Sequence, residues 1–491
     1  MAGARMLARR TGGVALACVI MLAAAACGGS AKKPAATPAT LRFRSRPDLR
    51  PPTVTVLKAA KDVAPGFVFI APKASSPQQG PEILDNSGQP VWFDPLGKEV
   101  TDFRVQTYHG RRVLTWWEGP RAAPVPGTGV GQYVIMNSSY HVIARVQTGY
   151  GPNTGDLHEF QLTPQGTALV TVDRVIPYDL SSIGGPKNGH VVDGVIQEID
   201  IATGRVVFTW HSLGHVSVGE SETKPPPPSG TASRAPYDYF HINSIDQEPN
   251  GDLLISARNT HAVYEIDHRT GAVIWRLGGK KSSFAMGKGT TFAWQHDARL
   301  QPDGTLTLFD DGAAPAVEKQ SRAIRIRLDS ATMTATLVQA DVSPDGVLAT
   351  SQGNAQLLPD GHLFVGWGSV PRFTEFDRAG KVVYDATFAT GDDSYRAYRF
   401  VWKGTPTTRP ALAVVAGTTT TTVYASWNGA TQVSRWRILA GPDKTHLAAV
   451  ATGPRAGFET PLKVSSDARF FAVEALDARG RVLSASAPAK P

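Results

Sequence analysis

Residues 250–277 read NGDLLISARNTHAVYEIDHRTGAVIWRL and carry the clearest structural signal in the chain. An Asn-Gly turn comes before an apolar run, a second run ends in Asp267, and a Thr-Gly turn comes before a third run that contains Trp275. Apolar runs of this length, separated by such turns, are typical of antiparallel β-strands. The stretch therefore predicts a small antiparallel sheet.

The same unit recurs at residues 193–210 and 359–384. Strand-length runs fill the sequence from Gly66 to about residue 400, and no helix-length amphipathic segment lies between them. Degenerate repeats of about 40–50 residues, each a four-stranded sheet, are typical of a β-propeller. We predict an all-β fold with a six-bladed β-propeller over residues 51–402. A tandem of stacked β-sandwiches is the alternative.

A Pro and Thr cluster at 405–410 marks a boundary, and the remaining residues contain about seven short strand-like runs. This length and spacing suit one β-sandwich. Residues 405–491 resemble a fibronectin type III domain, with Trp427 in the place of that domain's core tryptophan. We expect this domain to act as a spacer or an adhesion module.

The N-terminus has the features of an export signal. Basic residues precede a short apolar run that ends in small side chains directly before Cys27. This pattern predicts a signal peptide over 1–26, lipid on Cys27, and a disordered tether over 27–50, which would place the protein at the outer face of the cell membrane. A single-pass membrane anchor is the alternative. Cys18 and Cys27 are the only cysteines, so we expect no disulfide in the mature domain.

The net charge of +8 belongs to the N-terminal region. Residues 1–50 contain nine basic side chains and one acidic side chain, so 41 basic and 41 acidic side chains remain for residues 51–491. A neutral folded body argues against nucleic-acid binding. The glycine-rich stretch at 127–131 leads into a strand-like run and not into a helix, so it does not predict a nucleotide site either.

Three histidines stand in polar motifs: His158 in GDLHEF, His241 in DYFHINSID and His296 in WQHDAR. Arg258 follows the second motif. In a propeller, residues far apart in sequence meet at the central channel, so we predict that these four side chains lie together as catalytic residues. Imidazoles and one guanidinium can hold a tetrahedral oxyanion and attack it without a metal.

Neighbouring side chains are candidates for substrate binding. Period-two alternation would place His241, Asn243 and Ile245 on one face of a strand. Tyr239, Phe240 and Trp294 could form a wall on which a flat aromatic substrate stacks, with Arg299 close to His296. His211 and His215 have the spacing of a helical metal pair, but the glycine between them disfavours a helix, and we predict no metal site.

Several motifs together resemble the arylsulfotransferase family, in which an aryl sulfate ester and not a nucleotide sulfate is the donor. They are RPDLRPP (46–52), LTWWEG (114–119), LHEF (157–160), YFHINSID (239–246), IWRLGG (274–279), WQHDAR (294–299) and QGNAQ (352–356). The likeness covers roughly residues 46–400. It implies a six-bladed propeller, a cofactor-free transfer between phenols, and His296 as the nucleophile. On the same pattern His158, His241 and Arg258 hold the sulfate oxygens, with Asn243 and Asn354 beside the substrate.

The residue types suit this chemistry. Sulfuryl transfer places negative charge on the leaving phenolate and on the equatorial oxygens, which cations and hydrogen-bond donors stabilise. A neutral imidazole is a competent nucleophile, and a second imidazole can move the proton. Two other hypotheses remain: a catalytically silent propeller that binds a ligand or a cell-envelope partner, and a metal-dependent hydrolase or lyase.

Overall fold

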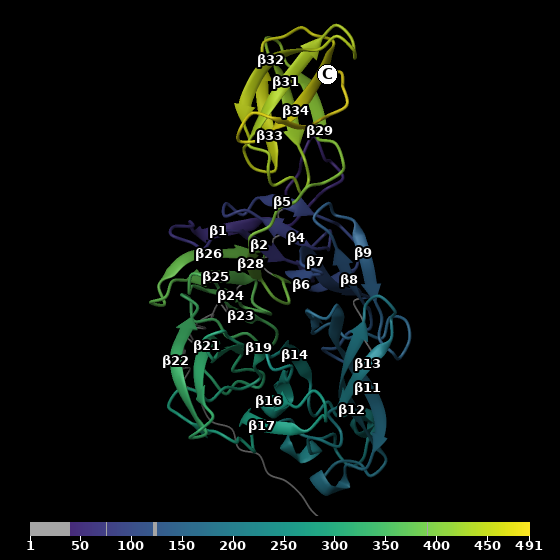
Figure 1. Ribbon diagram of the computed structural model, residues 1–491, viewed down its shortest axis with the longest axis vertical. Helices are drawn as coiled ribbons and strands as arrows, with labels where there is room; N and C mark the ends of the chain where they lie inside the picture. The colour runs from purple at the N-terminus through teal and green to yellow at the C-terminus, as the bar shows by residue number, and fades with distance from the viewer. Residues whose placement is uncertain (1–39, 75, 121–124, 390) are drawn as a thin grey trace, which may run out of the picture. The chain divides into compact units, whose positions relative to one another are not determined.

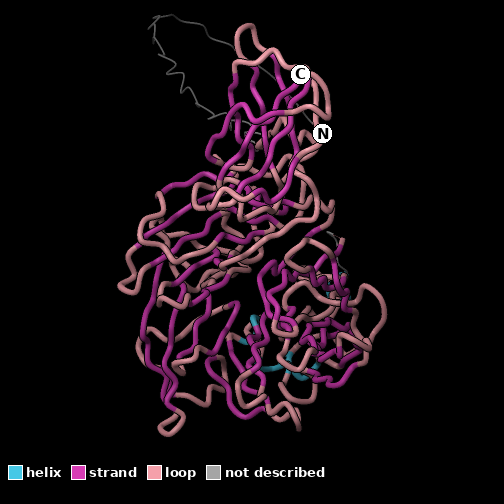
Figure 2. The backbone as a smooth tube through the Cα atoms, turned by 45° about the horizontal axis from the view of Figure 1, so that its top comes forward, coloured by secondary structure: helices cyan, strands magenta, loops and turns pink. Residues whose placement is uncertain are grey.

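The computed structural model describes residues 40–74, 76–120, 125–389 and 391–491 (Figure 1). Strands supply nearly all of the regular structure, as the tube view shows (Figure 2). The helices of the described residues are short 3-10 turns: η1 (Ser181–Ile183), η2 (Val218–Glu220), η3 (Thr231–Arg234) and η4 (Arg258–Thr260). The all-β prediction is confirmed.

None of these helices has the length and hydropathy needed to traverse a bilayer, a finding that covers the described ranges alone. The predicted signal peptide and Cys27 lie outside the described residues.

Six sheets of four or five strands follow one another around the body (Figure 1). In sheet order from the inner strand outward they are β28 (Tyr398–Phe400), β2 (Phe67–Ile70), β4 (Glu82–Leu84), β5 (Pro90–Phe93); β6 (Glu99–Tyr108), β7 (Arg111–Gly119), β8 (Gln132–Met136), β9 (Val142–Val146); β10 (Phe160–Leu162), β11 (Thr167–Tyr178), β12 (Gly189–Asp200), β13 (Val206–His211); β14 (Ile242–Gln247), β15 (Leu253–Ala257), β16 (Ala262–Ile266), β17 (Val273–Gly278); β19 (His296–Leu300), β20 (Thr305–Asp310), β21 (Arg322–Asp329), β22 (Thr334–Val342), β18 (Ala285–Met286); and β23 (Asn354–Leu357), β24 (Leu363–Gly366), β25 (Arg372–Phe376), β26 (Val382–Phe388), β1 (Val54–Lys58). A separate pair joins β3 (Lys73–Ala74) to β27 (Asp392–Asp393).

The stretch at 250–277 forms three adjacent strands of one sheet, as predicted. β15 pairs with β16 and β16 pairs with β17, all antiparallel. Every residue of β15 is buried because neighbouring sheets cover both of its faces. Leu254 of β15 packs with Ala298 and Leu306 of the next sheet, so the hydrophobic core lies between consecutive sheets.

Each of the six sheets has one edge strand that we call its inner strand. The inner strands are β28, β6, β10, β14, β19 and β23. Neighbouring sheets contact one another in sequence: β2 with β6, β6 with β10, β11 with β14, β14 with β19, β20 with β23, and β24 with β28. Two strands from distant parts of the chain join the first and last sheets, since β28 pairs with β2 and β1 pairs with β26. The segments that lead into the six inner strands are thereby brought to one end of the body.

Seven strands of the C-terminal region form two sheets. One sheet has the order β29 (Ala411–Ala416), β30 (Thr421–Ser426), β33 (Glu459–Val464), and the other has β32 (Ala448–Pro454), β31 (Arg435–Gly441), β34 (Phe470–Leu476), β35 (Val482–Ala485). Trp436 of β31 is 1% exposed at the centre of the core. The predicted core residue Trp427 is only half-buried and donates to Thr408 Oγ1 at 3.2 Å, because it lies just beyond the end of β30.

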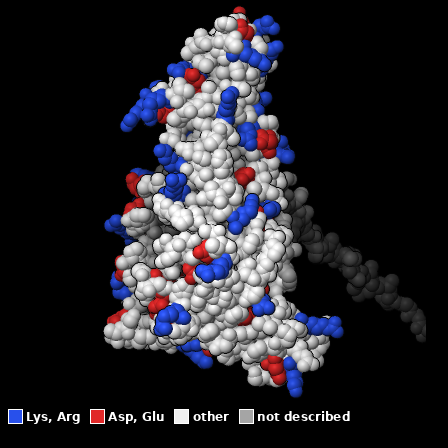
Figure 3. Space-filling model, turned by 45° about the vertical axis from the view of Figure 1, so that its right-hand side comes forward, with Lys and Arg blue, Asp and Glu red and all other residues white. Residues whose placement is uncertain are grey.

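The predicted disordered tether over residues 27–50 includes residues that belong to the folded body. From residue 40 the chain is packed against the folded body, with Phe43 and Leu49 buried beside Phe93 and Phe458. The prediction emphasised the Pro, Thr and basic residues of this segment and overlooked its apolar side chains. Basic and acidic groups are interspersed on the face shown in Figure 3, in keeping with the neutral charge of residues 51–491.

Candidate functional site

A cavity of about 460 Å³ lies where the inner strands begin. His296 is the first residue of β19, and His158, His241, Gln352 and Tyr395 stand one to three residues before β10, β14, β23 and β28. The complete lining is Lys73, Glu99, Pro120, Pro126, Gly127, Thr128, Leu157, His158, Asp238, His241, Arg258, Asn259, His296, Ser351, Gln352 and Tyr395. The structure thus brings together the four side chains predicted to be catalytic.

Each of the three histidines has its Nδ1 atom against a carboxylate. The Nδ1 to oxygen distance is 2.5 Å from His158 to Asp156, 2.5 Å from His241 to Asp238, and 2.7 Å from His296 to Asp311. Such a partner fixes the orientation of the ring and keeps a proton on Nδ1. The Nε2 atom is then the nitrogen left for chemistry in the cavity.

His296 has a second contact that supports this tautomer. The backbone N–H of Gln352 donates to its Nε2 atom at 3.2 Å, which requires a lone pair on Nε2. Burial lowers the pKa of His296 well below its usual range, and the positive charge of Arg258 adds to this effect. Burial also lowers the pKa of His158, although Asp156 opposes the change. His296 is therefore a neutral imidazole with a lone pair on Nε2.

Neighbouring groups also determine the charge of Asp156 and the arrangement of the His158 and His241 rings. Burial would raise the pKa of Asp156, yet His158 and the N–H of Gly129 hold it at about 2. The rings of His158 and His241 lie edge to face with their centroids 4.7 Å apart. Two imidazoles therefore share one side of the cavity.

Arg258 begins the short turn η4 and is held from several directions. Its guanidinium lies 4.7 Å from the ring centre of Trp294, a cation–π contact. Nη1 donates to Asn259 Oδ1 at 2.9 Å, and Nη2 donates to the carbonyl of Thr350 at 3.2 Å. The cation is thus positioned in the cavity, and no carboxylate among the described residues forms an ion pair with it.

His241 is not part of a strand, which corrects the predicted alternation. Its φ of 59° breaks the extended backbone, and β14 begins at Ile242. Asn243 is consequently buried away from the cavity, where its Nδ2 donates to the carbonyl of Gln295 at 2.7 Å. Tyr239 and Phe240 face the hydrophobic core.

Three further residues predicted to bind substrate do not line this cavity. Trp294 is buried beneath Arg258, so it positions the cation and does not form a wall. Asn354 exchanges two hydrogen bonds with the backbone of Ala397 and ties β23 to the segment before β28. Arg299 lies at the other end of β19, where it donates to Glu159 at 2.5 Å.

Sequence reasoning missed the residues that support the histidines. Asp156 and Asp238 were within reach of it, because each carboxylate lies two or three residues before its histidine. Asp311 lies 15 residues beyond His296 and reaches it only because β20 runs back alongside β19. Gln352 stands in the QGNAQ motif, but the motif gives no sign that its backbone N–H contacts His296, and no motif contains Tyr395.

No metal site is evident in the described part of the chain, where no group of three or more His, Cys, Asp or Glu side chains has a suitable arrangement. His211 and His215, the pair with helical metal-ligand spacing, form other contacts. Nδ1 of His211 lies 2.7 Å from Asp193, and Nδ1 of His215 lies 2.7 Å from the carbonyl of His211.

The sequence model of the arylsulfotransferase (ASST) family matches residues 104–389, more than half of the chain. The chain belongs to the arylsulfotransferase family. No curated protein gives a significant match.

Similar solved structures include three with low sequence identity. One is a protein of unknown function from Bacteroides caccae (14% identity, TM-score 0.40, 68% of this chain and 98% of that chain covered). The second is a catalytically inactive virginiamycin B lyase from Staphylococcus aureus with quinupristin (8% identity, TM-score 0.35, 77% of this chain and 97% of that chain covered). The third is an exo-β-1,3-galactanase from Phanerochaete chrysosporium with β-1,3-galactotriose (9% identity, TM-score 0.33, 82% of this chain and 94% of that chain covered).

Proposed function

We propose that this protein is an aryl-sulfate sulfotransferase that moves a sulfuryl group from a phenolic sulfate ester to a phenol through a sulfohistidine at His296. The main support is the convergence of three imidazoles, each with Nδ1 against a carboxylate, on one cavity that also holds Arg258. Family membership supplies the reaction class.

In the first half-reaction, Nε2 of His296 gives up its hydrogen bond from the Gln352 N–H and attacks the sulfur atom of the ester. The N–S bond forms while the S–O bond to the phenol breaks, and the electron pair leaves on the phenolate oxygen. Arg258 and His158 face the sulfuryl oxygens and stabilise their negative charge. Nδ1–H of His296 donates to Asp311, which stabilises the positive charge that develops on the ring.

Proton transfer is assigned to His241. Asp238 accepts from its Nδ1, so a second proton on Nε2 can pass to the departing phenolate. In the second half-reaction the same nitrogen takes the proton of the acceptor phenol. The acceptor oxygen then attacks sulfur, the N–S bond breaks, and His296 is regenerated. Ping-pong kinetics follow from this order.

A transfer assay tests the proposal. The purified protein is mixed with nitrophenyl sulfate and a phenol, and both nitrophenol release and the new aryl sulfate are measured. We expect His296→Ala to abolish transfer with the fold intact, while His211→Ala, a histidine outside the cavity, retains it. Intact mass spectrometry with donor alone should show one added SO3 group that His296→Ala lacks. Absence of transfer by the unaltered protein would favour a non-catalytic binding propeller.

For the fold, the proposal includes a six-bladed β-propeller. It is supported by six sheets in sequence, by contacts between each sheet and the next, and by strands from both ends of the region that complete the first and last sheets. The C-terminal sandwich is proposed to be fibronectin type III-like, since its three-stranded and four-stranded sheets have the strand order of that fold.

Export and lipid attachment at Cys27 complete the proposal, on the basis of the N-terminal sequence. Mass spectrometry of the membrane fraction should find lipid on Cys27, and Cys27→Ser should move the protein to the soluble fraction. An unlipidated protein that stays membrane-bound would instead favour a spanning anchor.

A further inference from the structure

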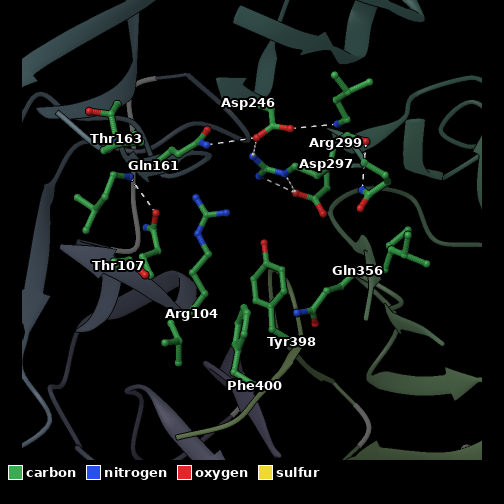
Figure 4. A pocket seen from close by; sticks show the side chains of 18 of the residues that line it. Arg104, Thr107, Gln161, Thr163, Asp246, Asp297, Arg299, Gln356, Tyr398 and Phe400 are labelled. Carbon is green, nitrogen blue, oxygen red and sulfur yellow. Dashed lines mark hydrogen bonds and ion pairs between the residues drawn. The ribbon is translucent and has the colours of Figure 1, made fainter. Parts of the chain in front are cut away.

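A second cavity, of about 600 Å³, lies at the opposite ends of the same inner strands (Figure 4). Residues from all six of these strands line it, among them Arg104 of β6, Gln161 of β10, Asp246 of β14, Arg299 of β19, Gln356 of β23 and Tyr398 of β28. It shares no lining residue with the histidine cavity. Its volume is within the range of small-molecule sites.

A buried charge network separates the two cavities. Glu159 accepts from Arg104 and Arg299 and lies 3.4 Å from Arg396. Arg396 is 2.7 Å from Asp102, and Arg299 is 2.7 Å from Asp297. Glu159, Asp102 and Arg396 are inaccessible or nearly so and line neither cavity, whereas Arg104, Arg299 and Asp297 reach the second one.

This pairing determines which ligands suit the second cavity. Arg104 and Arg299 are neutralised by carboxylates, and the lining also contains Asp246 and Asp297. An anion would compete with Glu159 and approach these two aspartates, whereas a cation would approach the guanidinium of Arg104. Because desolvating a charge without a partner is costly, the walls favour an uncharged ligand.

The lining nevertheless has hydrogen-bonding atoms without a partner. Nε of Arg104, a residue that is 8% exposed, is a buried donor that makes no hydrogen bond. Oε1 of Gln161 is a buried acceptor that makes none either, although Nε2 of the same side chain donates to Asp246 at 3.2 Å. In Figure 4 the Arg104 guanidinium and the Tyr398 hydroxyl point toward the centre of the lining, where Arg104 Nη2 donates to the carbonyl of Phe160 at 2.7 Å and Tyr398 donates to Asp102 at 3.3 Å. A ligand that accepts at one point and donates at another would satisfy both orphaned groups.

We propose that this cavity binds a neutral polyhydroxylated ligand of the saccharide class. A sugar hydroxyl both donates and accepts, which matches Arg104 Nε and Gln161 Oε1. The ring of Phe400, a half-buried residue that also lines the cavity, offers apolar surface to the C–H face of a pyranose. The site is independent of the sulfuryl-transfer site, so either assignment can fail without the other.

Isothermal titration of the full-length protein with cellobiose, maltose and lactose tests the proposal. We expect saturable binding of at least one disaccharide with one site per chain. Gln161→Met removes the orphaned acceptor and should weaken this binding about tenfold. Thr107→Trp fills the mouth of the cavity from an exposed position, so it should block binding in a folded protein whose sulfuryl transfer is unchanged.

His296→Ala provides the matched control and should bind the disaccharide as the unaltered protein does. Inorganic sulfate, added to His296→Ala, should not displace the disaccharide. The proposal is overturned if none of the three disaccharides binds at millimolar concentration, if Thr107→Trp binds normally, if His296→Ala loses binding, or if sulfate displaces the sugar.

Discussion

Asp311 determines which nitrogen of His296 is free to react. Its carboxylate accepts from Nδ1 at 2.7 Å, and this leaves the lone pair on Nε2. A carboxamide can donate to Nδ1 and so favours the opposite tautomer, a change that costs up to about 10⁴-fold in a hydrolytic triad. We expect Asp311→Asn to lower kcat for sulfuryl transfer by about 10²–10⁴-fold with little change in KM, measured from initial rates.

Asp193 offers a matched control for this substitution. Its carboxylate lies 2.7 Å from Nδ1 of His211, a histidine that does not line the cavity. Asp193→Asn should therefore leave kcat unchanged. Equal losses in the two variants would show that the Asp311 effect is structural and not tautomeric.

The protonation of His296 sets the acidic limit of activity. Burial and Arg258 lower its pKa, so the ring stays neutral at pH values where an ordinary histidine, with a pKa of about 6.5, is protonated. We expect the acidic limb of the kcat/KM profile to fall at a pH clearly below about 6.5. Arg258→Met removes the nearby cation and should move this limb to higher pH. A limb at or above the ordinary histidine pKa would contradict the assignment.

The site residues lie in the segments that lead into the inner strands. The sequence predicted only part of how these segments are arranged. The repeated turn-and-strand pattern was sufficient for the all-β fold, and the polar motifs around the three histidines and Arg258 were needed to select the four clustered side chains. Alternation failed at His241 because its positive φ turns the chain just before β14 and sends Tyr239 and Phe240 into the core. Asn354 and Arg299 were misassigned because their partners, Ala397 and Glu159, lie directly before β28 and β10, which belong to other sheets. Such partners depend on how the sheets are placed, which a local pattern does not encode.

Gly353 in the segment before β23 holds the Gln352 N–H against His296. Its φ is +103°, and an added Cβ would lie 2.5 Å from Cδ1 of Phe309 and 2.9 Å from the carbonyl of Gly366. We expect Gly353→Ala to displace this segment, to destabilise the fold by about 1–3 kcal/mol and to reduce kcat. Denaturant unfolding and initial rates measure the two effects.

Gly304 offers a control that distinguishes steric displacement from backbone strain. Its φ is +75°, but an added Cβ would meet no atom within 4 Å. Gly304→Ala should therefore show only the cost of the left-handed conformation, about 1 kcal/mol, with kcat unchanged. If Gly353→Ala behaved in the same way, the segment would not control His296.

At the scale of the whole body, groups from β6, β14 and β19 and from the segment before β28 converge on the buried carboxylate of Glu159. Burial would raise its pKa, but Arg104, Arg299 and Arg396 hold it at about 2, against about 4.3 in an unfolded chain. A lowered pKa gives stability that is fully present above about pH 4.3 and is lost as the pH falls toward 2. We expect Glu159→Gln to leave three guanidiniums underpaired and to reduce the free energy of unfolding at neutral pH by about 3–5 kcal/mol.

The pH dependence distinguishes this electrostatic role from a packing defect. The stability difference between the unaltered protein and Glu159→Gln should narrow as the pH falls from about 4.3 toward about 2, because the unaltered protein then loses the same charge. Denaturant unfolding at several pH values, followed by near-ultraviolet circular dichroism, measures this difference. Glu222→Gln, at an exposed position, should give no difference at any pH. A deficit in Glu159→Gln that stayed constant with pH would mean that shape, and not charge, holds the inner strands together at this point.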